Sequence, residues 1–341
     1  MNEKLATIEK ITDIQPIDGA DFISSASILG YKSVIKKSDF KIGDMVIFIK
    51  PDTLVKRAEW NKFLWPKKDI SPDSEPIRIR CCKFKKSISQ GLIISINNLE
   101  QRDRIEGQGV EEELFITKYI KEIPVQLRGK IKGNFPVYLF PKTDELNILS
   151  YPNVLMEFIG KPYYLTVKYD GTSISFYFDN GVFGVCSRNL ELLDDDSNVY
   201  WKMAKKYDLQ EKLTSFNKNL AIQAEIVGPN INGNKVGLFE VQMFVFDIYD
   251  LDKKEYYDKF DLQDFCEAMN LERVEVIDSN PSFNYTINEL EALAIGYYKN
   301  NANLPREGIV LRPLEPIYSP VLEKRLSVKI MNKNFLLKYE E

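Results

Sequence analysis

The sequence contains no histidine. This absence excludes imidazole bases, nucleophile pairs that depend on histidine, and metal sites with histidine ligands. Only four cysteines are present, two of them adjacent at Cys81 and Cys82 and none spaced as Cys-x-x-Cys, so neither a disulfide framework nor a zinc site is indicated. Any catalysis must therefore use lysine, arginine, acidic or hydroxyl side chains, together with a cation that prefers oxygen ligands.

Long apolar segments are also lacking. No stretch approaches the roughly 20 apolar residues of a membrane span, and the chain does not start with the charged and then apolar pattern of a secretory signal. We therefore expect a soluble cytoplasmic protein, or a nuclear one in a eukaryotic cell, with no membrane association and no required protein partner. The net charge of -4 argues against an indiscriminate coat on nucleic acid, although it does not describe local grooves.

The length of 341 residues suits two domains of ordinary size. The first hundred residues contain short strand patterns separated by turns, at residues 31–36, 45–49, 77–84 and 91–96, with a turn at 41–44. This density of short strands suits a small barrel such as an OB-fold, and a β-sandwich fits nearly as well.

The second part of the chain differs in pattern. After the acidic run Glu111-Glu112-Glu113 the composition changes, and we place a domain boundary near residue 125, which gives domains 1–125 and 126–341. Beyond it, strand patterns alternate with helical ones. The strands are expected at residues 163–169, 173–178, 220–227, 241–248 and 308–312, and the helices at 199–212, 262–269 and 287–299. The second domain is predicted to be α+β.

The sharpest local pattern is Lys168-Tyr169-Asp170-Gly171, at the end of an apolar strand. Taken alone, it is also typical of a surface turn. Phe246 is ambiguous in the same way, because its strand alternates as a simple core strand does. The order of several such strings decides between these interpretations.

Five further strings follow in order: Ser187-Arg188-Asn189, Gln223-Ala224-Glu225, Phe246-Asp247-Ile248, Glu307-Gly308-Ile309-Val310 and Ser327-Val328-Lys329. The whole set resembles the covalent nucleotidyltransferase superfamily of ATP-dependent DNA and RNA ligases and mRNA capping enzymes. Segments 19–23, 43–44, 89–92 and 141–145 are similar to one branch, the nick-sealing RNA ligases of the Deinococcus and Naegleria type. The resemblance implies an N-terminal OB-fold barrel followed by an adenylyltransferase domain of antiparallel sheets and helices, like the ATP-grasp-like ligases.

The resemblance also implies a function. An ATP-dependent RNA ligase would carry AMP on Lys168, transfer it to an RNA 5′-phosphate, and seal that end to a 3′-hydroxyl at a nick in a duplex with RNA on the 3′-hydroxyl side. The implied catalytic residues are Lys168 and Lys329. ATP binding is implied for Lys168, Glu225, Phe246, Glu307, Lys329 and Lys142, and RNA binding for Arg188 and Asn189. Mg²⁺ or Mn²⁺ would be held by Asp170, Glu225 and Glu307, through water.

Elementary chemistry agrees with a lysine nucleophile that needs help. A free lysine has a pKa near 10.4, so its neutral amine is rare at pH 7. Burial and a nearby divalent cation both favour the neutral amine, whereas carboxylates directly against Lys168 raise its pKa. The cation must therefore act between the carboxylates and the amine.

Two positions depart from the family pattern. Ser327 stands where relatives have a lysine, and Leu146-Asn147 stands where they commonly have a basic residue, so Lys142 is the expected replacement at the triphosphate. Three alternatives stay open: a DNA ligase, an mRNA capping guanylyltransferase and a non-catalytic RNA-binding protein. The first two families generally carry their OB domain after the transferase core, so the order expected here favours the RNA ligase.

Overall fold

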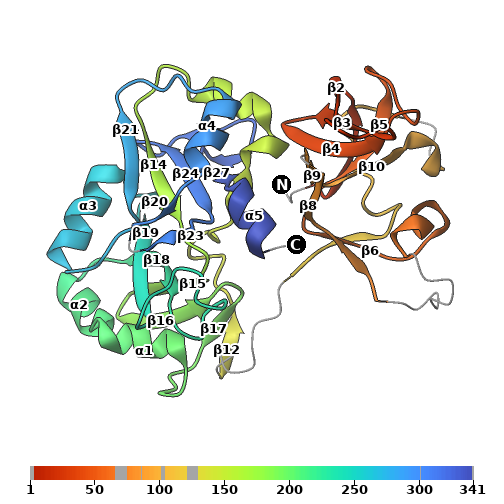
Figure 1. Cartoon of the computed structure of the whole chain (residues 1–341). Helices are drawn as coiled ribbons and strands as arrows, with labels where there is room; N and C mark the ends of the chain where they lie inside the picture. Colours follow the sequence, from red (N-terminus) through yellow and green to blue (C-terminus); the bar gives the residue numbers. More distant parts are fainter. Residues whose placement is uncertain are drawn as a thin grey trace. The chain divides into compact units, whose positions relative to one another are not determined.

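The computed structural model describes residues 4–65, 75–85, 87–100, 104–120, 130–299 and 301–339. The chain forms two compact units, coloured mainly red to yellow and green to blue in Figure 1. Unit 1 comprises Met1–Lys121, Leu149–Pro152 and Leu336–Glu341, and unit 2 comprises Glu122–Ile148 and Asn153–Phe335. The boundary near residue 125 lies outside the described residues and stays a prediction.

Unit 1 is built from short antiparallel strands around an apolar core (Figure 1). Its central strand β5 (Met45–Ile49) pairs with both β1 (Ala6–Lys10) and β10 (Leu92–Ser95), and four of its five residues are buried. The other strands are β2 (Asp13–Pro16), β3 (Ile23–Ile28), β4 (Tyr31–Lys36), β6 (Thr53–Val55), β7 (Ile77–Ile79), β8 (Cys81–Phe84), β9 (Ser87–Gln90) and β11 (Ile116–Lys118).

The strands predicted at residues 31–36 and 45–49 are confirmed, and the one at 91–96 is present as β10. The single strand predicted at 77–84 is wrong. The chain changes partners at Arg80, because β7 pairs with β6 and β8 pairs with β9. A continuous apolar pattern cannot reveal such an exchange of ladder partners.

Unit 2 contains a seven-stranded and a five-stranded sheet. In spatial order, the first sheet is β12 (Ile131–Asn134), β17 (Leu190–Leu192), β16 (Val182–Ser187), β15 (Thr172–Asp179), β18 (Leu220–Val227), β19 (Gln242–Asp250) and β20 (Glu255–Tyr256). The second is β13 (Leu146–Asn147), β27 (Val328–Met331), β24 (Gly308–Pro313), β14 (Tyr163–Lys168) and β21 (Val276–Asn280). Two hairpins complete the unit: β22 (Tyr297–Tyr298) with β23 (Asn301–Pro305), and β25 (Tyr318–Ser319) with β26 (Lys324–Arg325).

The two faces of the seven-stranded sheet differ in chemistry. On one face, apolar side chains such as Ile174, Phe176 and Ile222 form the main core with residues of three helices. Successive side chains of a strand point to opposite faces, so Gln223 and Glu225 lie on the other face. Figure 1 shows these helices along one side of the strands, which leaves the polar face for the site.

The helices are α1 (Val199–Lys206), α2 (Leu209–Phe216), α3 (Lys259–Ala268), α4 (Ile287–Ala294) and α5 (Lys333–Tyr339). The helix predicted at 199–212 is wrong in its continuity, because Asp208 adopts a left-handed φ of 51° and separates α1 from α2. The helix predicted at 287–299 ends early, at Ala294, and residues 297–298 form β22. The strands predicted in this unit are all present, with ends that differ by two residues at most.

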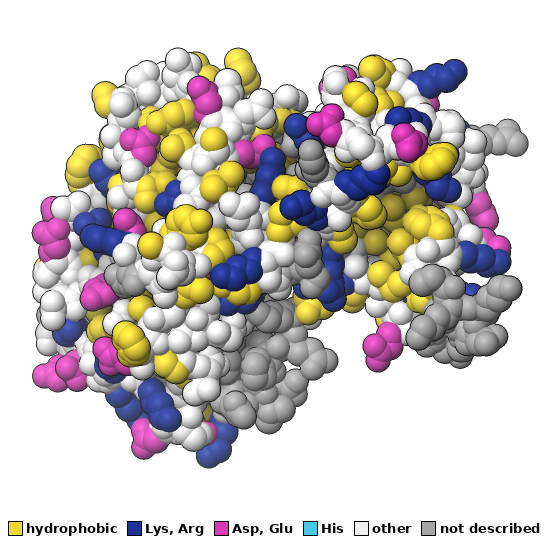
Figure 2. Space-filling view, viewed as in Figure 1, with side chains coloured by type: hydrophobic (Ala, Val, Ile, Leu, Met, Phe, Trp, Pro, Cys, Tyr) yellow, Lys and Arg dark blue, Asp and Glu magenta, His cyan; other side chains and the backbone are white. Residues whose placement is uncertain are grey.

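Surface charge on unit 2 is mixed. Figure 2 shows its lysine and arginine side chains interspersed with acidic ones on the face in view. Among the described residues, no helix is long and apolar enough to cross a membrane.

Candidate active site

Lys168 lies at the last position of β14, opposite Gly308, the first residue of β24. Its Nζ donates a hydrogen bond of 2.7 Å to Oε2 of Glu307, and both side chains are largely buried. A Cβ on Gly308 would overlap the carbonyl oxygen of Ile330, so only glycine lets β24 lie this close to β27. The end of one strand and the start of the next thus bring the lysine and the glutamate together.

Glu225 and Asp170 complete the surroundings of this lysine. The backbone N–H of Gly171 donates to Oε1 of Glu225 at 3.1 Å. A Cβ on Gly171 would overlap the carbonyl oxygen of Ile226, so glycine is required for the turn to lie against β18. Residues distant in the sequence form one buried cluster, which we call the nucleophile cluster: Lys168, Asp170, Glu225 and Glu307.

The electrostatics of the nucleophile cluster oppose a neutral amine. Burial lowers the pKa of Lys168, but the charges of Glu307, Glu225 and Asp170 outweigh burial, and the pKa is raised above its usual value. Burial raises the pKa of Glu225 to about 8, with a further contribution from Glu307 and Asp170. Burial also raises the pKa of Glu307. The expectation that burial helps to deprotonate Lys168 is therefore insufficient without a further positive charge.

Lys235, which the sequence did not indicate, also contacts the nucleophile cluster. Its Nζ lies 2.7 Å from Oδ2 of Asp170. It follows a tight turn in which Asn232 and Asn234 have left-handed φ angles, and Asn232 donates to the carbonyl oxygen of Gly171. The run of asparagine and glycine around it predicts a turn, but no local pattern shows that this turn reaches Asp170.

Lys329 and Phe246 lie near the cluster on neighbouring strands. Lys329 on β27 pairs with Val310 on β24, and its charge lowers the pKa of Glu307, opposing the effect of burial. Phe246 stands at an irregularity in the pairing of β18 with β19 and packs, partly buried, against the cluster that contains Phe244 and Tyr298. Their assignment to the nucleotide stays a prediction.

The remaining predicted residues pair with one another. Nζ of Lys142 donates to Oδ1 of Asn189 at 2.9 Å, and Arg188 forms an ion pair of 2.6 Å with Asp144. Both contacts join the segment before β13 to the turn after β16. The Arg188 and Asp144 side chains are each about half exposed, so a phosphate can replace the carboxylate at small cost.

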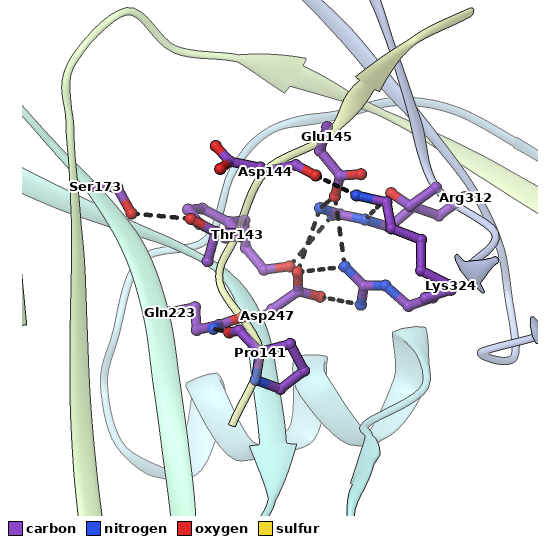
Figure 3. A network of polar contacts seen from close by, with 12 residues as sticks. Pro141, Thr143, Asp144, Glu145, Ser173, Gln223, Asp247, Arg312 and Lys324 are labelled. Carbon is purple, nitrogen blue, oxygen red and sulfur yellow. Dashed lines mark hydrogen bonds and ion pairs between the residues drawn. The ribbon is translucent and has the colours of Figure 1, made fainter. Parts of the chain in front are cut away.

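A second buried charge cluster lies beside the first, and we call its members Glu145, Asp247, Arg312 and Arg325 the arginine network. Figure 3 shows Glu145 and Asp247 turned toward Arg312, which contacts them at 2.9 and 3.3 Å. Arg325 binds both oxygens of Asp247, at 2.7 and 2.6 Å. Burial would raise the pKa of Glu145, but the two guanidinium groups outweigh it and lower the pKa to about 2.

Ser327 belongs to the arginine network. Its side chain is buried, and its hydroxyl accepts a hydrogen bond of 3.0 Å from Nε of Arg312. The position where relatives have a lysine is therefore occupied by a side chain that contacts the arginine network.

The residues fit a metal that keeps its water shell. Within the described ranges, no group of three or more acidic or cysteine side chains is placed to bind a metal ion directly. The carboxylates of the nucleophile cluster are hard oxygen donors, and Mg²⁺ commonly binds through few direct carboxylate contacts and several waters. The arrangement suits a cation held through water.

Comparisons with known proteins agree with this geometry. A family model for RNA ligases matches residues 161–331, and an OB-fold domain model matches residues 5–96. Solved structures of Naegleria gruberi RNA ligase are similar over nearly the whole chain: two variants, one with ATP and Mn and one with AMP and Mn, each show 31% identity, cover 99% of both chains and have a TM-score of 0.90. The protein with pyrophosphate has the same identity and coverage and a TM-score of 0.89. Among curated protein sequences, none matches the chain. The predicted fold class is confirmed.

Proposed function

The chain belongs to the RNA ligase family, and we propose that it uses ATP and a divalent cation to seal nicks in duplexes that have RNA on the 3′-hydroxyl side. The observation that supports this most directly is the nucleophile cluster, where Lys168 contacts Glu307 at 2.7 Å with Glu225 and Asp170 close enough to raise its pKa. The Naegleria structures with ATP and Mn support the same choice of nucleotide and metal.

In the first step, Nζ of Lys168 attacks the α-phosphorus of ATP. A nitrogen–phosphorus bond forms, the bond to the β-phosphate oxygen breaks, and pyrophosphate leaves with its electron pair. The amine must lose its extra proton before attack, and Glu307 is the carboxylate that accepts its hydrogen bond. Lys329, on β27 beside β24, would neutralise charge on the α-phosphate oxygens.

The carboxylates have a separate task. Asp170, Glu225 and Glu307 would hold Mg²⁺ or Mn²⁺ through its water shell. When bound, the cation supplies positive charge that favours the neutral amine and the leaving pyrophosphate. Because three carboxylates raise the pKa of Lys168 in the protein alone, this charge is needed before attack.

Other residues bind the nucleotide. Glu225 would also accept hydrogen bonds from the ribose hydroxyls, and Phe246 would stack on adenine, since it packs at the edge of an aromatic cluster. Lys142 would contact the triphosphate after it exchanges its bond to Asn189. Its exposure makes that exchange easy.

In the later steps AMP passes to the RNA 5′-phosphate, and the 3′-hydroxyl then displaces AMP from the RNA-adenylate. Arg188 and Asn189 would bind the RNA end, with a phosphate taking the place of Asp144 at the guanidinium group. The OB-fold domain would hold the duplex through contacts to the sugar-phosphate backbone of the nucleic acid, largely without sequence preference.

The test is formation of a covalent adduct. The protein is incubated with ATP or GTP labelled at the α-phosphate, with Mg²⁺ or Mn²⁺, and denatured before the label is measured. We expect ATP to label the wild type and not Lys168→Ala. Lys132→Ala is the matched control, because Lys132 also pairs with a glutamate at 2.7 Å but lies outside the cluster. No adduct, or an adduct on Lys168→Ala, would refute the mechanism.

The substrate is tested separately. Nicked duplexes that carry RNA or DNA on the 3′-hydroxyl side are compared, and we expect sealing of the RNA nick. Preference for DNA would indicate a DNA ligase, and labelling by GTP in place of ATP would indicate a capping enzyme.

A further inference from the structure

One phenol oxygen joins the two loops that carry Asp170 and Glu307. The backbone N–H of Asp170 and the backbone N–H of Glu307 each donate to the hydroxyl oxygen of Tyr298, at 3.2 Å. Tyr298 is a residue of β22, ten positions before Gly308, and only 2% of its surface is exposed. None of the sequence strings described above includes it.

This contact forms at the point where strands β14 and β24 separate. β14 and β24 pair in register, and Lys168 opposite Gly308 is the last pair of the ladder. Asp170 and Glu307 lie just beyond that pair, so their amides have no partner across the ladder. Buried backbone donors require acceptors, and a phenol oxygen can accept two hydrogen bonds. Tyr298 therefore bridges the segment after β14 and the segment before β24, at the end of the ladder that these two strands form.

The ring of Tyr298 is held by aromatic packing. It stacks on Tyr169 with a centroid distance of 5.3 Å and an interplanar angle of 18°, and Tyr169 stacks on Phe244 at 4.6 Å and 7°. Tyr169 lies between the nucleophile and Asp170 in the sequence. The stack fixes the phenol ring, so its oxygen has little freedom to follow the loops if they move apart.

We propose that Tyr298 is a positioning residue for nucleotidyl transfer: its oxygen sets the spacing of Asp170 and Glu307 on the two sides of Lys168. This inference rests on the proposed function of that cluster. The two carboxylates have different partners, since Glu307 binds Lys168 and Asp170 binds Lys235. The backbone N–H groups of the same two residues both bind the Tyr298 oxygen.

The consequence concerns rate more than affinity. A loss of the oxygen leaves two partly buried amides without this acceptor, and the two loops can then take other positions. The carboxylates would no longer hold the geometry around the amine that attack requires, whereas adenine and ribose contacts are made elsewhere. Loss of an outer contact of this kind typically costs about 10- to 100-fold in activity.

The test is Tyr298→Phe, which keeps the stacked ring and removes only the hydroxyl. Tyr177→Phe is the matched control, because Tyr177 is also a buried phenol, but it belongs to another core cluster and its hydroxyl donates to the carboxylate of Glu191. For both variants we would measure the single-turnover rate of adduct formation with labelled ATP, the KM for ATP, the melting temperature, and amide exchange at residues 170 and 307.

We expect Tyr298→Phe to lose about 10-fold or more of the adenylation rate with KM within about 2-fold, and to exchange both amides faster. Tyr177→Phe should keep the rate and the exchange. A wild-type rate in Tyr298→Phe, unchanged amide exchange, or a loss of rate explained by a lower folded fraction would overturn the inference. Failure of the wild type to form an adduct would instead overturn the proposed function.

Discussion

The arginine network and the nucleophile cluster are both buried in unit 2, and both combine acidic and basic side chains. In the arginine network, two guanidinium groups face two carboxylates, and Arg325 binds Asp247 with both of its terminal nitrogens. In the nucleophile cluster, one lysine faces three carboxylates, and only Glu307 receives its hydrogen bond. The first is paired within itself, whereas the second has three acidic side chains for one lysine.

The pKa values show what this difference means. Arginine partners lower the pKa of Glu145 to about 2, while burial raises that of Glu225 to about 8. The arginine network therefore favours the ionised form of Glu145 and stabilises the fold. In the nucleophile cluster, burial favours the protonated form of Glu225 and Glu307, and this suits the additional positive charge that the proposed function requires. Four experiments test this contrast.

The largest expected effect is on the network. Arg325→Met leaves Asp247 buried without its bidentate partner, and breaking a buried pair in this way typically costs about 3–5 kcal/mol of unfolding free energy. Lys168→Met should abolish the AMP adduct and also lower the unfolding free energy, but by less than Arg325→Met does, because the raised pKa values of Glu225 and Glu307 let these carboxyls bind protons when the lysine is lost. Denaturant unfolding measures the stability of both variants, and the labelling assay measures the adduct.

Lys324→Met is the control for the network variant. Lys324 is the neighbour of Arg325, but its ammonium group donates to the backbone oxygen of Asp144, and it lowers the pKa of Glu145 less than either arginine does. Its loss should cost less than about 1 kcal/mol. If Arg325→Met were as stable as Lys324→Met, the network would not be the structural element described above.

The next effect is a gain of stability at the cost of function. Glu225 binds a proton in the folded protein up to about pH 8, whereas in the unfolded chain it releases that proton near pH 4.5. The folded state thus binds more protons between these values, so stability falls as the pH rises from 4.5 to 8. Glu225→Gln should remove this dependence, stabilise the ligand-free protein by up to roughly 3 kcal/mol at pH 7, and lose activity.

Unfolding by denaturant at pH 5 and pH 8 checks this expectation. Glu255→Gln serves as the comparison, since Glu255 is exposed and pairs only with Lys253 at 3.5 Å. A wild type equally stable at both pH values, or a destabilised Glu225→Gln at pH 8, would contradict the argument.

The network should show the opposite dependence on pH. Glu145 stays ionised in the folded protein down to about pH 2, whereas the unfolded chain takes up a proton near pH 4.5. The unfolded state binds more protons in this window, so acid destabilises the fold, by roughly 3 kcal/mol at its lower end. In Glu145→Gln this part of the acid dependence should disappear, although the variant is less stable at pH 7. If the unfolding free energy of the wild type and of Glu145→Gln fell equally on acidification, the proposed role of Glu145 would be refuted.

Part of this contrast could be predicted from the sequence. The strands of unit 2 were predicted because their apolar alternation is local, and the order of the strings located Lys168, Glu225 and Glu307. Tyr298 and Lys235 were not found, because their contacts with Asp170 depend on how a hairpin and a turn fold back. The pairing of Arg188 with Asp144 was missed for the same reason, since the two residues lie 44 positions apart in the sequence.

Ser327 gives the smallest expected effect and the finest distinction between the two clusters. The family pattern has a lysine at this position, which suggests a lost phosphate contact, but the Ser327 hydroxyl accepts its bond from Arg312 and is buried. Ser327→Ala should therefore cost about 1.5 kcal/mol of stability, as one hydrogen bond to a charged donor is removed, and leave the KM for ATP unchanged. Lys329→Ala, in contrast, should raise that KM or lower the adenylation rate without a comparable loss of stability. A higher KM in Ser327→Ala would indicate that its hydroxyl contacts the nucleotide. The assignment of Ser327 to the arginine network would then be wrong.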